Sequence, residues 1–415
     1  MNVLVFNPGG NSLKAGIVSC EPQEQSASDA AKAIEVIVEG IGKQATLGVY
    51  HGKAIAHSEP IDAGSFEQAT ESILNWLESW AGAGELQWSL KETGCIGIRV
   101  VHGGSRFTAA TEITREVEAE ITELAKWAPL HNRRSIEILP PLRHRAAGIP
   151  IYAVFDTAFH TTIPPKASLY AIPFELSRKH GIYRYGFHGI SHRYLMERYA
   201  AIANKRPEEL NLVTMHLESG CSVTAISKGK SVDNTMGLTP LEGLMMGTRS
   251  GDVDPALPAF LAKQEKLDLD AVMDILEKRS GLLGVSGVSL DTRVLMRHYN
   301  TDERVRIAME MFSYRLLKAI GAYLAALGGA DAVIFGGGIA ENTSLVRQRV
   351  CDCLRWCGLE MDEKQNQELI DVEGRLSIVD SKIQAYVIPA EEILQIAHEC
   401  CQAVSTSQLR SAEGP

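Results

Sequence analysis

The sequence has no run of about 18 apolar residues, the length that a membrane-spanning helix requires, so we expect no membrane partner. The N-terminus carries no basic segment ahead of its first apolar residues, and we therefore expect no signal peptide. Eight cysteines in 415 residues are too few for a disulfide scaffold and are typical of reduced thiols. Together these absences predict a cytoplasmic protein.

Positive charge is also in short supply. The chain has 41 Lys and Arg against 51 Asp and Glu, a net charge of -10, which argues against a nucleic-acid partner held by phosphate contacts. A small anionic ligand stays compatible, because a local cluster of Arg and His can oppose the overall sign. The fractions of 45% hydrophobic and 22% charged residues are ordinary for a globular protein. At this length they predict two to three domains.

Several well-known site motifs are missing. The sequence contains no Walker phosphate loop, and no Gly-x-Gly-x-x-Gly follows a predicted strand. The pair His188 and His192 lacks the Glu of a His-Glu-x-x-His zinc motif and an obvious third ligand. Cys351, Cys353 and Cys357 lack the spacing of a zinc ribbon, and no His completes the set. We therefore interpret these cysteines as structural or incidental thiols.

Two similar hairpins are the most informative feature that is present. Val3–Val18 and Leu212–Ile226 each consist of an apolar strand, a polar residue at its end, a turn containing Gly, and a returning strand. Asn7–Ser12 and His216–Ser222 occupy equivalent places in them. The chain therefore looks like an internal duplication of one α/β unit.

Strands and helices alternate along the rest of the chain. Ser65 and Gln68 form a capping-box pair at the start of an amphipathic helix, and a second long helix is predicted over Val305–Leu327. Ile151–Phe155 is predicted to be the first strand of a second lobe. This alternation indicates the α/β class, and residues 403–415 are predicted to form a polar tail.

The turns of the two hairpins place backbone N–H groups where they can surround an anion. Gly338–Asn342, which follows the predicted strand Ala332–Phe335, is interpreted as a third glycine loop of this kind. An ordinary tight turn is the alternative for each turn alone. The three together favour a phosphate-binding cleft between duplicated halves.

Charged and imidazole side chains gather between the hairpins and shortly after the second one, with two of them, Arg99 and Asp156, at predicted strand ends: Arg99, His131, Asp156, His188 and Arg249. Such a set supplies cations for a highly charged transition state and a carboxylate that can orient an acceptor. Phosphoryl transfer requires both. Any one of these residues alone would more often have a structural role.

Three segments carry a family resemblance: Ser231–Pro255, Phe155–His160 and Tyr185–Gly189. They closely resemble the acetate kinase (acetokinase) family of short-chain carboxylate kinases, and the resemblance is collinear from Met1 to about Ala397. It implies two duplicated ribonuclease-H-like domains of the actin-like ATPase type, with an active-site cleft between them. The implied boundaries are 1–150 plus about 386–402 for the N-terminal lobe and 151–385 for the C-terminal lobe.

The resemblance also implies the reaction of ATP with acetate to give ADP and acetyl phosphate, with Mg²⁺ or alternatively Mn²⁺, in a homodimer formed through the C-terminal lobe. By position, Asn7 and Glu392 match metal-site residues and Arg99 matches the arginine that binds the carboxylate. Asp156 matches the residue that transfers a proton or orients the substrate oxygen. His188 and Arg249, with His131 alongside them, match the groups that stabilise the phosphoryl transition state. Nucleotide-binding positions are matched by Lys14, His216, Leu217, Glu218, Ser219, Gly220, Asp291, Thr292, Arg293, Gly338, Ile339, Ala340, Glu341 and Asn342.

This sequence departs from the family pattern at four places. Asn7–Lys14, His216–Gly220 and Gly338–Asn342 each differ from the usual loop, and Arg133 stands where the family has Pro. Glu218 replaces a glycine and adds a negative charge where phosphates should approach. Neutral drift in a working kinase is one interpretation of these changes. The alternatives are another phosphoryl donor such as pyrophosphate, another acceptor such as propionate or butyrate, or a catalytically weak ligand-binding homologue.

Overall fold

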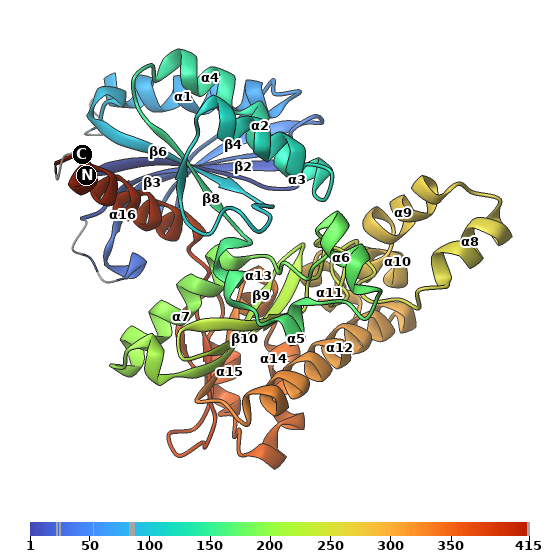
Figure 1. The fold of residues 1–415 in the computed structure, drawn as a ribbon. Helices are drawn as coiled ribbons and strands as arrows, with labels where there is room; N and C mark the ends of the chain where they lie inside the picture. The colour runs from blue at the N-terminus through green and yellow to red at the C-terminus, as the bar shows by residue number, and fades with distance from the viewer. Residues whose placement is uncertain (22–23, 25, 53, 83–87, 413–415) are drawn as a thin grey trace. The chain divides into compact units, whose positions relative to one another are not determined.

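The structure is a computed structural model that describes the chain except residues 22–23, 25, 53, 83–87 and 413–415. Its contacts divide the chain into two compact units, each built around one β-sheet (Figure 1). Unit 1 contains Met1–Phe159, Gly189–Glu197 and Glu391–Pro415. Unit 2 contains His160–His188 and Arg198–Ala390. No helix among the described residues has both the length and the apolar content that a bilayer span needs.

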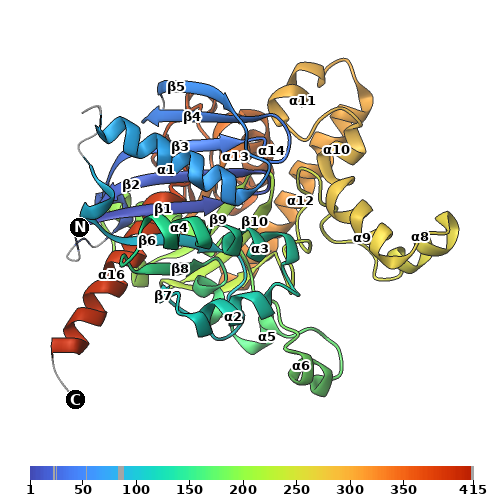
Figure 2. The ribbon, with the colours of Figure 1, turned by 90° about the horizontal axis from the view of Figure 1, so that it is seen from above.

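The sheet of unit 1 begins as an antiparallel meander and continues as parallel strands, which Figure 2 shows side by side. Its strands, in spatial order, are β5 (Ala54–Ile61), β4 (Ala45–His51), β3 (Ala31–Glu39), β2 (Ser12–Ser19), β1 (Asn2–Pro8), β6 (Thr93–Val100), β8 (Ile151–Phe155) and β7 (Thr111–Glu112). Strands β1, β6 and β8 are parallel neighbours. Their carboxyl ends therefore meet at one edge of the sheet, where α/β proteins place their ligands.

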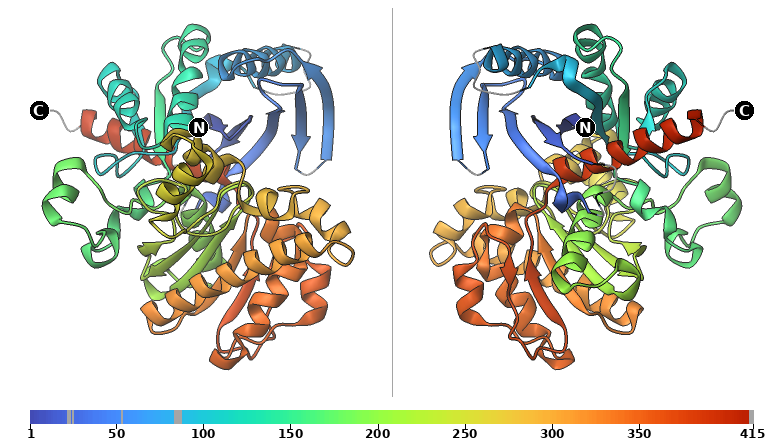
Figure 3. Two further views of the ribbon diagram at one scale, coloured as in Figure 1. Left: turned by 90° about the vertical axis from the view of Figure 1, so that its right-hand side faces the viewer. Right: turned by 90° about the vertical axis from the view of Figure 1, so that its left-hand side faces the viewer.

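Helices cover both faces of this sheet, which explains why its central strands are apolar throughout. One face packs against α1 (Phe66–Gly82) and α3 (Pro129–Glu137), and α4 (Leu139–Arg145) packs against these two helices. The opposite face packs against α16 (Glu392–Ala412), drawn in red in Figure 3. Gly97 on β6 provides the space for this contact, because a Cβ there would lie 2.8 Å from both Ile396 and Cys400. The chain's last helix thus places Glu392 beside its first strand.

The sheet of unit 2 has the strand order β11 (Lys230–Asn234), β10 (Cys221–Ser227), β9 (Asn211–Leu217), β12 (Ala332–Gly336), β14 (Gln384–Val387) and β13 (Gly374–Arg375). Strands β9, β12 and β14 are parallel, and β9 and β10 form an antiparallel hairpin, as β1 and β2 do in unit 1. The long helix α12 (Glu303–Leu327) packs on β9 and β10. Asp302 caps it by accepting hydrogen bonds from the backbone N–H groups of residues 304 and 305.

The remaining α-helices are α2 (Arg115–Leu124), α5 (Pro165–Ser168), α6 (Phe174–His180), α7 (Gly189–Ala203), α8 (Leu257–Glu265), α9 (Leu269–Lys278), α10 (Gly281–Ser286), α11 (Thr292–His298), α13 (Gly338–Asn342), α14 (Ser344–Cys353) and α15 (Glu363–Glu368). Short 3₁₀ turns occupy Ala27–Asp29, Leu90–Glu92, Ala158–Thr162, Pro207–Glu209 and Arg355–Cys357.

Several local expectations from the sequence are wrong. Ile151–Phe155 does not open the second lobe, because it is hydrogen-bonded to β6 within the sheet of unit 1. Gly338–Asn342 is a short helix rather than a loop, since Gly337 makes the turn after β12 in one residue. The capping box at Ser65 is incomplete: Ser65 Oγ accepts from the backbone of Gln68, whose own side chain accepts from Gly64.

The two ends of the predicted C-terminal segment also differ from expectation. Strand β14 ends at Val387 within unit 2, so the return to unit 1 begins at Glu391 rather than near residue 386. The stretch predicted as a polar tail continues as helix α16 to Ala412, and residues 413–415 lie outside the described residues. The hydroxyls of Ser405 and Thr406 donate to carbonyls one turn earlier, which lets polar residues continue the helix.

Candidate active site

Four of the predicted site residues meet where β1, β6 and β8 end in unit 1. Arg99 Nε and Nη2 donate to the two oxygens of Asp156, at 3.0 and 2.7 Å. Arg99 Nη1 donates to Asn7 Oδ1 at 3.1 Å and to Glu392 Oε2 at 3.3 Å. Asn7 Nδ2 closes the ring by donating to the same Glu392 oxygen at 2.7 Å. These four residues form one hydrogen-bonded group, which we call the unit 1 cluster.

The unit 1 cluster is shielded from water and carries an excess of negative charge. Side-chain exposure is 1% for Asp156, 11% for Glu392 and 13% for Arg99. Two carboxylates share one guanidinium, so the cluster sums to one negative charge. Because the pairs are shielded, removing Arg99 would leave two carboxylates poorly solvated and close together, which is strongly unfavourable.

The Arg99 fork faces Asp156 in this structure. Bidentate hydrogen bonding of a guanidinium to a carboxylate uses two parallel N–H groups, and here both are given to Asp156. A substrate carboxylate that took the same fork would have to displace Asp156 from it. The geometry therefore couples the position of Asp156 to the binding of an acidic ligand.

The predicted metal pair has the chemistry that magnesium prefers. Asn7 contributes an amide oxygen and Glu392 a carboxylate, both of them hard oxygen donors. Among the described residues, no group of three or more His, Cys, Asp or Glu is arranged to hold a metal ion. Magnesium commonly takes one or two protein oxygens and completes its shell with water and substrate phosphates. The negative charge of the unit 1 cluster fits such a cation.

Two further predicted residues lie in unit 1. Lys14 on β2 is the cross-strand partner of Asn7 on β1, so its position is set by the first hairpin. His131 lies half-buried on α3. Arg134 on the same helix donates to the carbonyl of Gly9 at 3.1 Å and so holds the hairpin turn. Lys14 is thus in a different unit from the other predicted nucleotide residues.

His188 and Arg249 come together in unit 2. His188 has a left-handed backbone, with φ of 56°, and immediately precedes α7. Its Nδ1 lies 2.9 Å from Ser222 Oγ, and its ring centroid is 4.3 Å from that of His216. A Cβ at Gly220 would lie 3.2 Å from both His188 Nε2 and Arg249 Nη1. The second hairpin turn is therefore tight at Gly220, because the ends of both side chains approach it.

Hydrogen bonds join the segment that carries Arg249 to the same turn. Gly247 N donates to the carbonyl of Ser219 at 3.1 Å. Arg249 Nη1 donates to the carbonyl of Pro240 at 3.2 Å and contacts Met246 Sδ at 3.8 Å. Residues 216–220 and 247–249 thus form one surface of unit 2 with His188.

The predicted nucleotide segments of unit 2 are neighbours. Strands β9 and β12 are parallel and pair His216 with Gly336, so the turns after them lie together. Gly337 has φ of 86°, and a Cβ there would meet the backbone of Leu217 at 2.7 Å. Helix α13 consequently starts beside Glu218. Thr292 Oγ1, 3.0 Å from Thr343 Oγ1, connects the predicted segment 291–293 to the residue after α13.

Of the acidic residues in these segments, Asp291 has an ion-pair partner, whereas Glu341 is buried beside backbone N–H groups. Asp291 caps α11 and forms an ion pair of 2.7 Å with the exposed Arg293. Glu341 is buried, and its Oε1 accepts from the backbone N–H groups of Gly337 and Ala390 at 2.8 and 3.3 Å. Burial, with a smaller contribution from the charge of Glu218, raises the pKa of the Glu341 carboxyl to about 7. Glu218 therefore acts electrostatically on the residues of α13.

Sequence reasoning missed two residues that hold these groups in place. Ser222, the partner of His188, follows the turn as Ser12 does in the first hairpin, and that equivalence was an available signal. Arg347 is completely buried and donates to four backbone carbonyls and one amide oxygen, among them the carbonyls of Ala340 and Glu341 in α13. A single Arg in a mixed helix gives no sequence signal of this role.

The fold and these clusters define an α/β phosphotransferase with two domains of the actin-like ATPase type, whose acceptor is a carboxylate. More particularly, the chain belongs to the acetokinase family, which it matches over residues 2–398.

Individual relatives cover nearly the whole chain. An acetate kinase of Solibacter usitatus is 43% identical over 408 residues, which cover 97% of this chain and 98% of that protein. The crystal structure of an acetate kinase from Porphyromonas gingivalis is 36% identical, with a TM-score of 0.85 and coverage of 95% of this chain and 98% of that one. A propionate kinase from Francisella tularensis is 33% identical, again with a TM-score of 0.85 and coverage of 96% and 98%.

The raised pKa of Glu341 makes stability depend on pH. Between the ordinary pKa of about 4.5 and the native value of about 7, the folded protein keeps a proton that the unfolded chain releases. The free energy of unfolding should therefore fall as pH rises through this window, by roughly 3 kcal/mol at most. Glu341→Gln should lose less stability than the wild type between pH 5 and pH 8 in denaturant titrations. Equal losses in the two proteins would contradict this assignment.

Proposed function

We propose that this protein catalyses the reversible transfer of a phosphoryl group from ATP to acetate, giving acetyl phosphate and ADP. The unit 1 cluster carries the proposal, because it holds a shielded guanidinium whose bidentate fork matches a small carboxylate. Acetate offers little surface for binding, so charge and positioning must supply most of its affinity. The names of the relatives, acetate kinase and propionate kinase, give the acceptor class.

In unit 1, Arg99 attracts the carboxylate of the acceptor and Asp156 orients the oxygen that attacks phosphorus. Asp156 is suited to this role because it lies at the acceptor position, on the same Arg99 fork that the acceptor carboxylate would take. An attacking oxygen held in line with the leaving group gains most of the entropic advantage available to an enzyme. Lys14 contributes positive charge at the same hairpin, and His131 lies on α3, the helix whose Arg134 holds the hairpin turn.

Asn7 and Glu392 would hold Mg²⁺ through their oxygens, with Mn²⁺ as an alternative metal. When bound, such an ion neutralises phosphate charge in the transition state. The unit 1 cluster would then change from one excess negative charge to one excess positive charge. An anionic acceptor and a polyphosphate would meet attraction instead of repulsion.

In unit 2, His188 and Arg249 stabilise the charge that develops on the transferred phosphoryl group. The contact between His188 Nδ1 and Ser222 orients the ring so that Nε2 points to Gly220, where Arg249 Nη1 also lies. Donors fixed in advance need no reorganisation during the reaction, which makes them effective catalysts. The nucleotide is bound by residues 216–220, 291–293 and 338–342.

A second candidate function differs in the phosphoryl donor. Glu218 places a carboxylate among the predicted nucleotide segments, close enough to raise the pKa of Glu341. That charge opposes ATP phosphates and favours a donor bound differently, such as pyrophosphate. A change of acceptor to propionate or butyrate is the corresponding alternative on the unit 1 side.

The proposal extends to the working state of the enzyme. It includes a homodimer formed through unit 2, as the family resemblance implies. All eight cysteines are free thiols, which supports a reducing, cytosolic compartment.

Trapping acyl phosphates with hydroxylamine tests the reaction directly. The purified protein is assayed with Mg²⁺, each of ATP, GTP and pyrophosphate as donor, and each of acetate, propionate and butyrate as acceptor. The proposal predicts the highest kcat/KM with ATP and acetate. Product with pyrophosphate alone would establish the second candidate. If no donor and acceptor pair gives an acyl phosphate although ligands raise the melting temperature, the protein is a ligand-binding homologue and not a kinase.

Glu218→Gly tests whether this carboxylate obstructs ATP. Removing a negative charge near phosphates should raise kcat/KM for ATP about tenfold, equivalent to roughly 1.4 kcal/mol. Glu218→Gln is the matched control, since it keeps the side chain and removes only the charge. An improvement in both variants assigns the effect to charge, whereas an unchanged or lower value in both contradicts obstruction.

Arg249→Ala should lower kcat by about 10² to 10³, the usual loss when a fixed transition-state donor is removed. KM for ATP should change by less than about threefold, because the interaction is made mainly in the transition state. Arg198→Ala, which breaks an ion pair with Glu373, is the control for loss of an arginine from unit 2. A large rise in KM with little change in kcat would make Arg249 a binding residue.

A further inference from the structure

The segment that carries Arg249 has no regular secondary structure to hold it. Residues 235–249 form neither helix nor strand. The Arg249 guanidinium is held from this segment through the carbonyl of Pro240, at 3.2 Å. The direction in which Arg249 points therefore depends on what fixes Pro240, together with the contact to Met246 Sδ.

Three hydrogen-bonded side chains hold the segment both before and after Pro240. The Glu242 carboxylate, two residues after it, accepts hydrogen bonds from Arg184 Nη1 and from the hydroxyl of Tyr170. The same Tyr170 oxygen accepts from the backbone N–H of Leu238, two residues before Pro240, at 2.8 Å. We call Tyr170, Arg184 and Glu242 the clasp.

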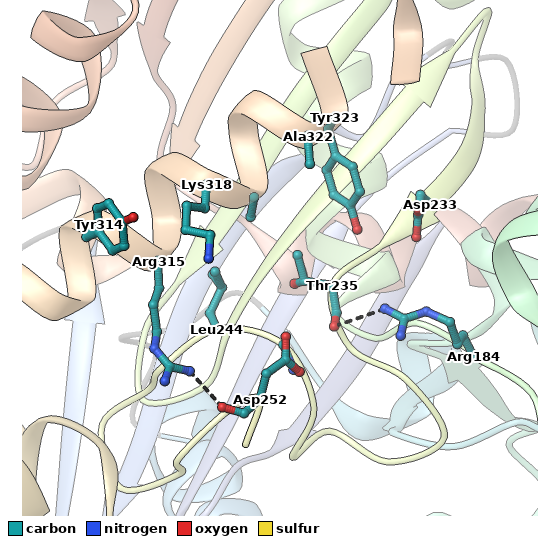
Figure 4. Close-up of a pocket in the computed structure, with 12 residues that line it drawn as sticks. Arg184, Asp233, Thr235, Leu244, Asp252, Tyr314, Arg315, Lys318, Ala322 and Tyr323 are labelled. Carbon is teal, nitrogen blue, oxygen red and sulfur yellow. Dashed lines mark hydrogen bonds between the residues drawn. The ribbon is translucent and has the colours of Figure 1, made fainter. Parts of the chain in front are cut away.

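Other contacts extend the clasp along the same segment. Arg184 Nη2 donates to the carbonyls of Asn234 and Thr235, at 3.2 and 3.4 Å, and Figure 4 shows the second of these bonds. Glycine at 237 is required, because a Cβ there would overlap the carboxylate of Glu242 and the hydroxyl of Tyr170. Arg184 and Glu242 are only 23% and 27% exposed, so their ion pair is partly protected from water.

Burial keeps the Tyr170 hydroxyl protonated. Burial raises the pKa of the Tyr170 hydroxyl above its usual range, and the hydrogen bond to Glu242 adds to this. Tyr170 therefore remains a donor to Glu242 throughout the working pH range. The hydroxyl can accept from Leu238 at the same time, because it offers one donor and two lone pairs.

On the side of the segment that faces α12, open space takes the place of packed apolar side chains. A cavity of about 600 Å³ separates Thr235 and Leu244 from Lys318 and Tyr314 on α12 (Figure 4). Arg184 lies at the Thr235 end of this cavity. With open space behind it, the segment relies on directional polar contacts to keep its conformation.

We propose that Tyr170, Arg184 and Glu242 are positioning residues that orient Arg249 for catalysis by fixing the Pro240 carbonyl. The inference rests on the proposed transition-state role of Arg249. It assigns a kinetic function to side chains that do not themselves contact the reacting groups. A clasp that served stability alone would leave the orientation of Arg249 unchanged.

Steady-state kinetics of Glu242→Gln and Tyr170→Phe in the full-length enzyme test the proposal. Each should lower kcat about 10- to 100-fold, with KM for ATP and acetate within about threefold, because an arginine that acts in the transition state is displaced. Glu373→Gln is the matched control. It breaks a bidentate ion pair with Arg198 of similar exposure, 33% and 32%, and should keep wild-type kcat. Wild-type kcat in both clasp variants would overturn the proposal.

A double-mutant cycle separates positioning from a general loss of structure. In the Arg249→Ala background, Glu242→Gln or Tyr170→Phe should lower kcat by less than about threefold, because the group they orient is absent. An undiminished loss in that background would overturn the proposal. If one clasp variant fails to fold, the other carries the cycle. Wild-type kcat in Arg249→Ala alone would instead refute the transition-state role of Arg249, and so the proposed function of unit 2.

Discussion

Two carboxylates and one guanidinium, all nearly removed from water, impose the strongest constraint on this protein. Each charge would be costly to bury alone, and each is stabilised only while its partners keep their positions. Asp156 is hydrogen-bonded to Arg99, and Arg99 is also hydrogen-bonded to Asn7 and Glu392. Glu392 is the first residue of the chain's final helix. Unit 1 is therefore completed by its C-terminal segment, because the cluster cannot be satisfied without it.

The same physical rule places the groups of both units. Parallel strands end at a common edge, so polar residues at or next to those ends gather without any sequence motif that joins them. In unit 1 the ends of β1, β6 and β8 bring together Asn7, Arg99 and Asp156. In unit 2 the ends of β9 and β12 bring the second hairpin turn beside α13. The unit 1 group is thus built from side chains, whereas the unit 2 group combines two turns with the side chains of His188 and Arg249.

Much of the fold could be predicted from the sequence, and the gaps have physical causes. The two hairpins and the long helix α12 follow from apolar periodicity, and the α/β class follows from their alternation. The unit to which Ile151–Phe155 belongs could not be predicted, because an apolar strand fits either sheet until its partner is known. The proximity of Asn7 and Glu392 came from the family resemblance alone, since 385 residues separate them. Arg347 and the clasp were not predicted, because isolated polar residues in helices and loops give no periodic signal.

Arg99 is the residue on which the account of acceptor binding depends, and Arg99→Lys tests it most directly. Lysine keeps the positive charge and loses the planar fork that serves Asp156, Asn7 and Glu392 together. KM for acetate and for ATP should be measured at fixed Mg²⁺ in this variant and in the wild type. The account predicts a rise of at least about tenfold in KM for acetate, with KM for ATP within about threefold. An unchanged KM for acetate, or an equal rise for both substrates, would contradict it.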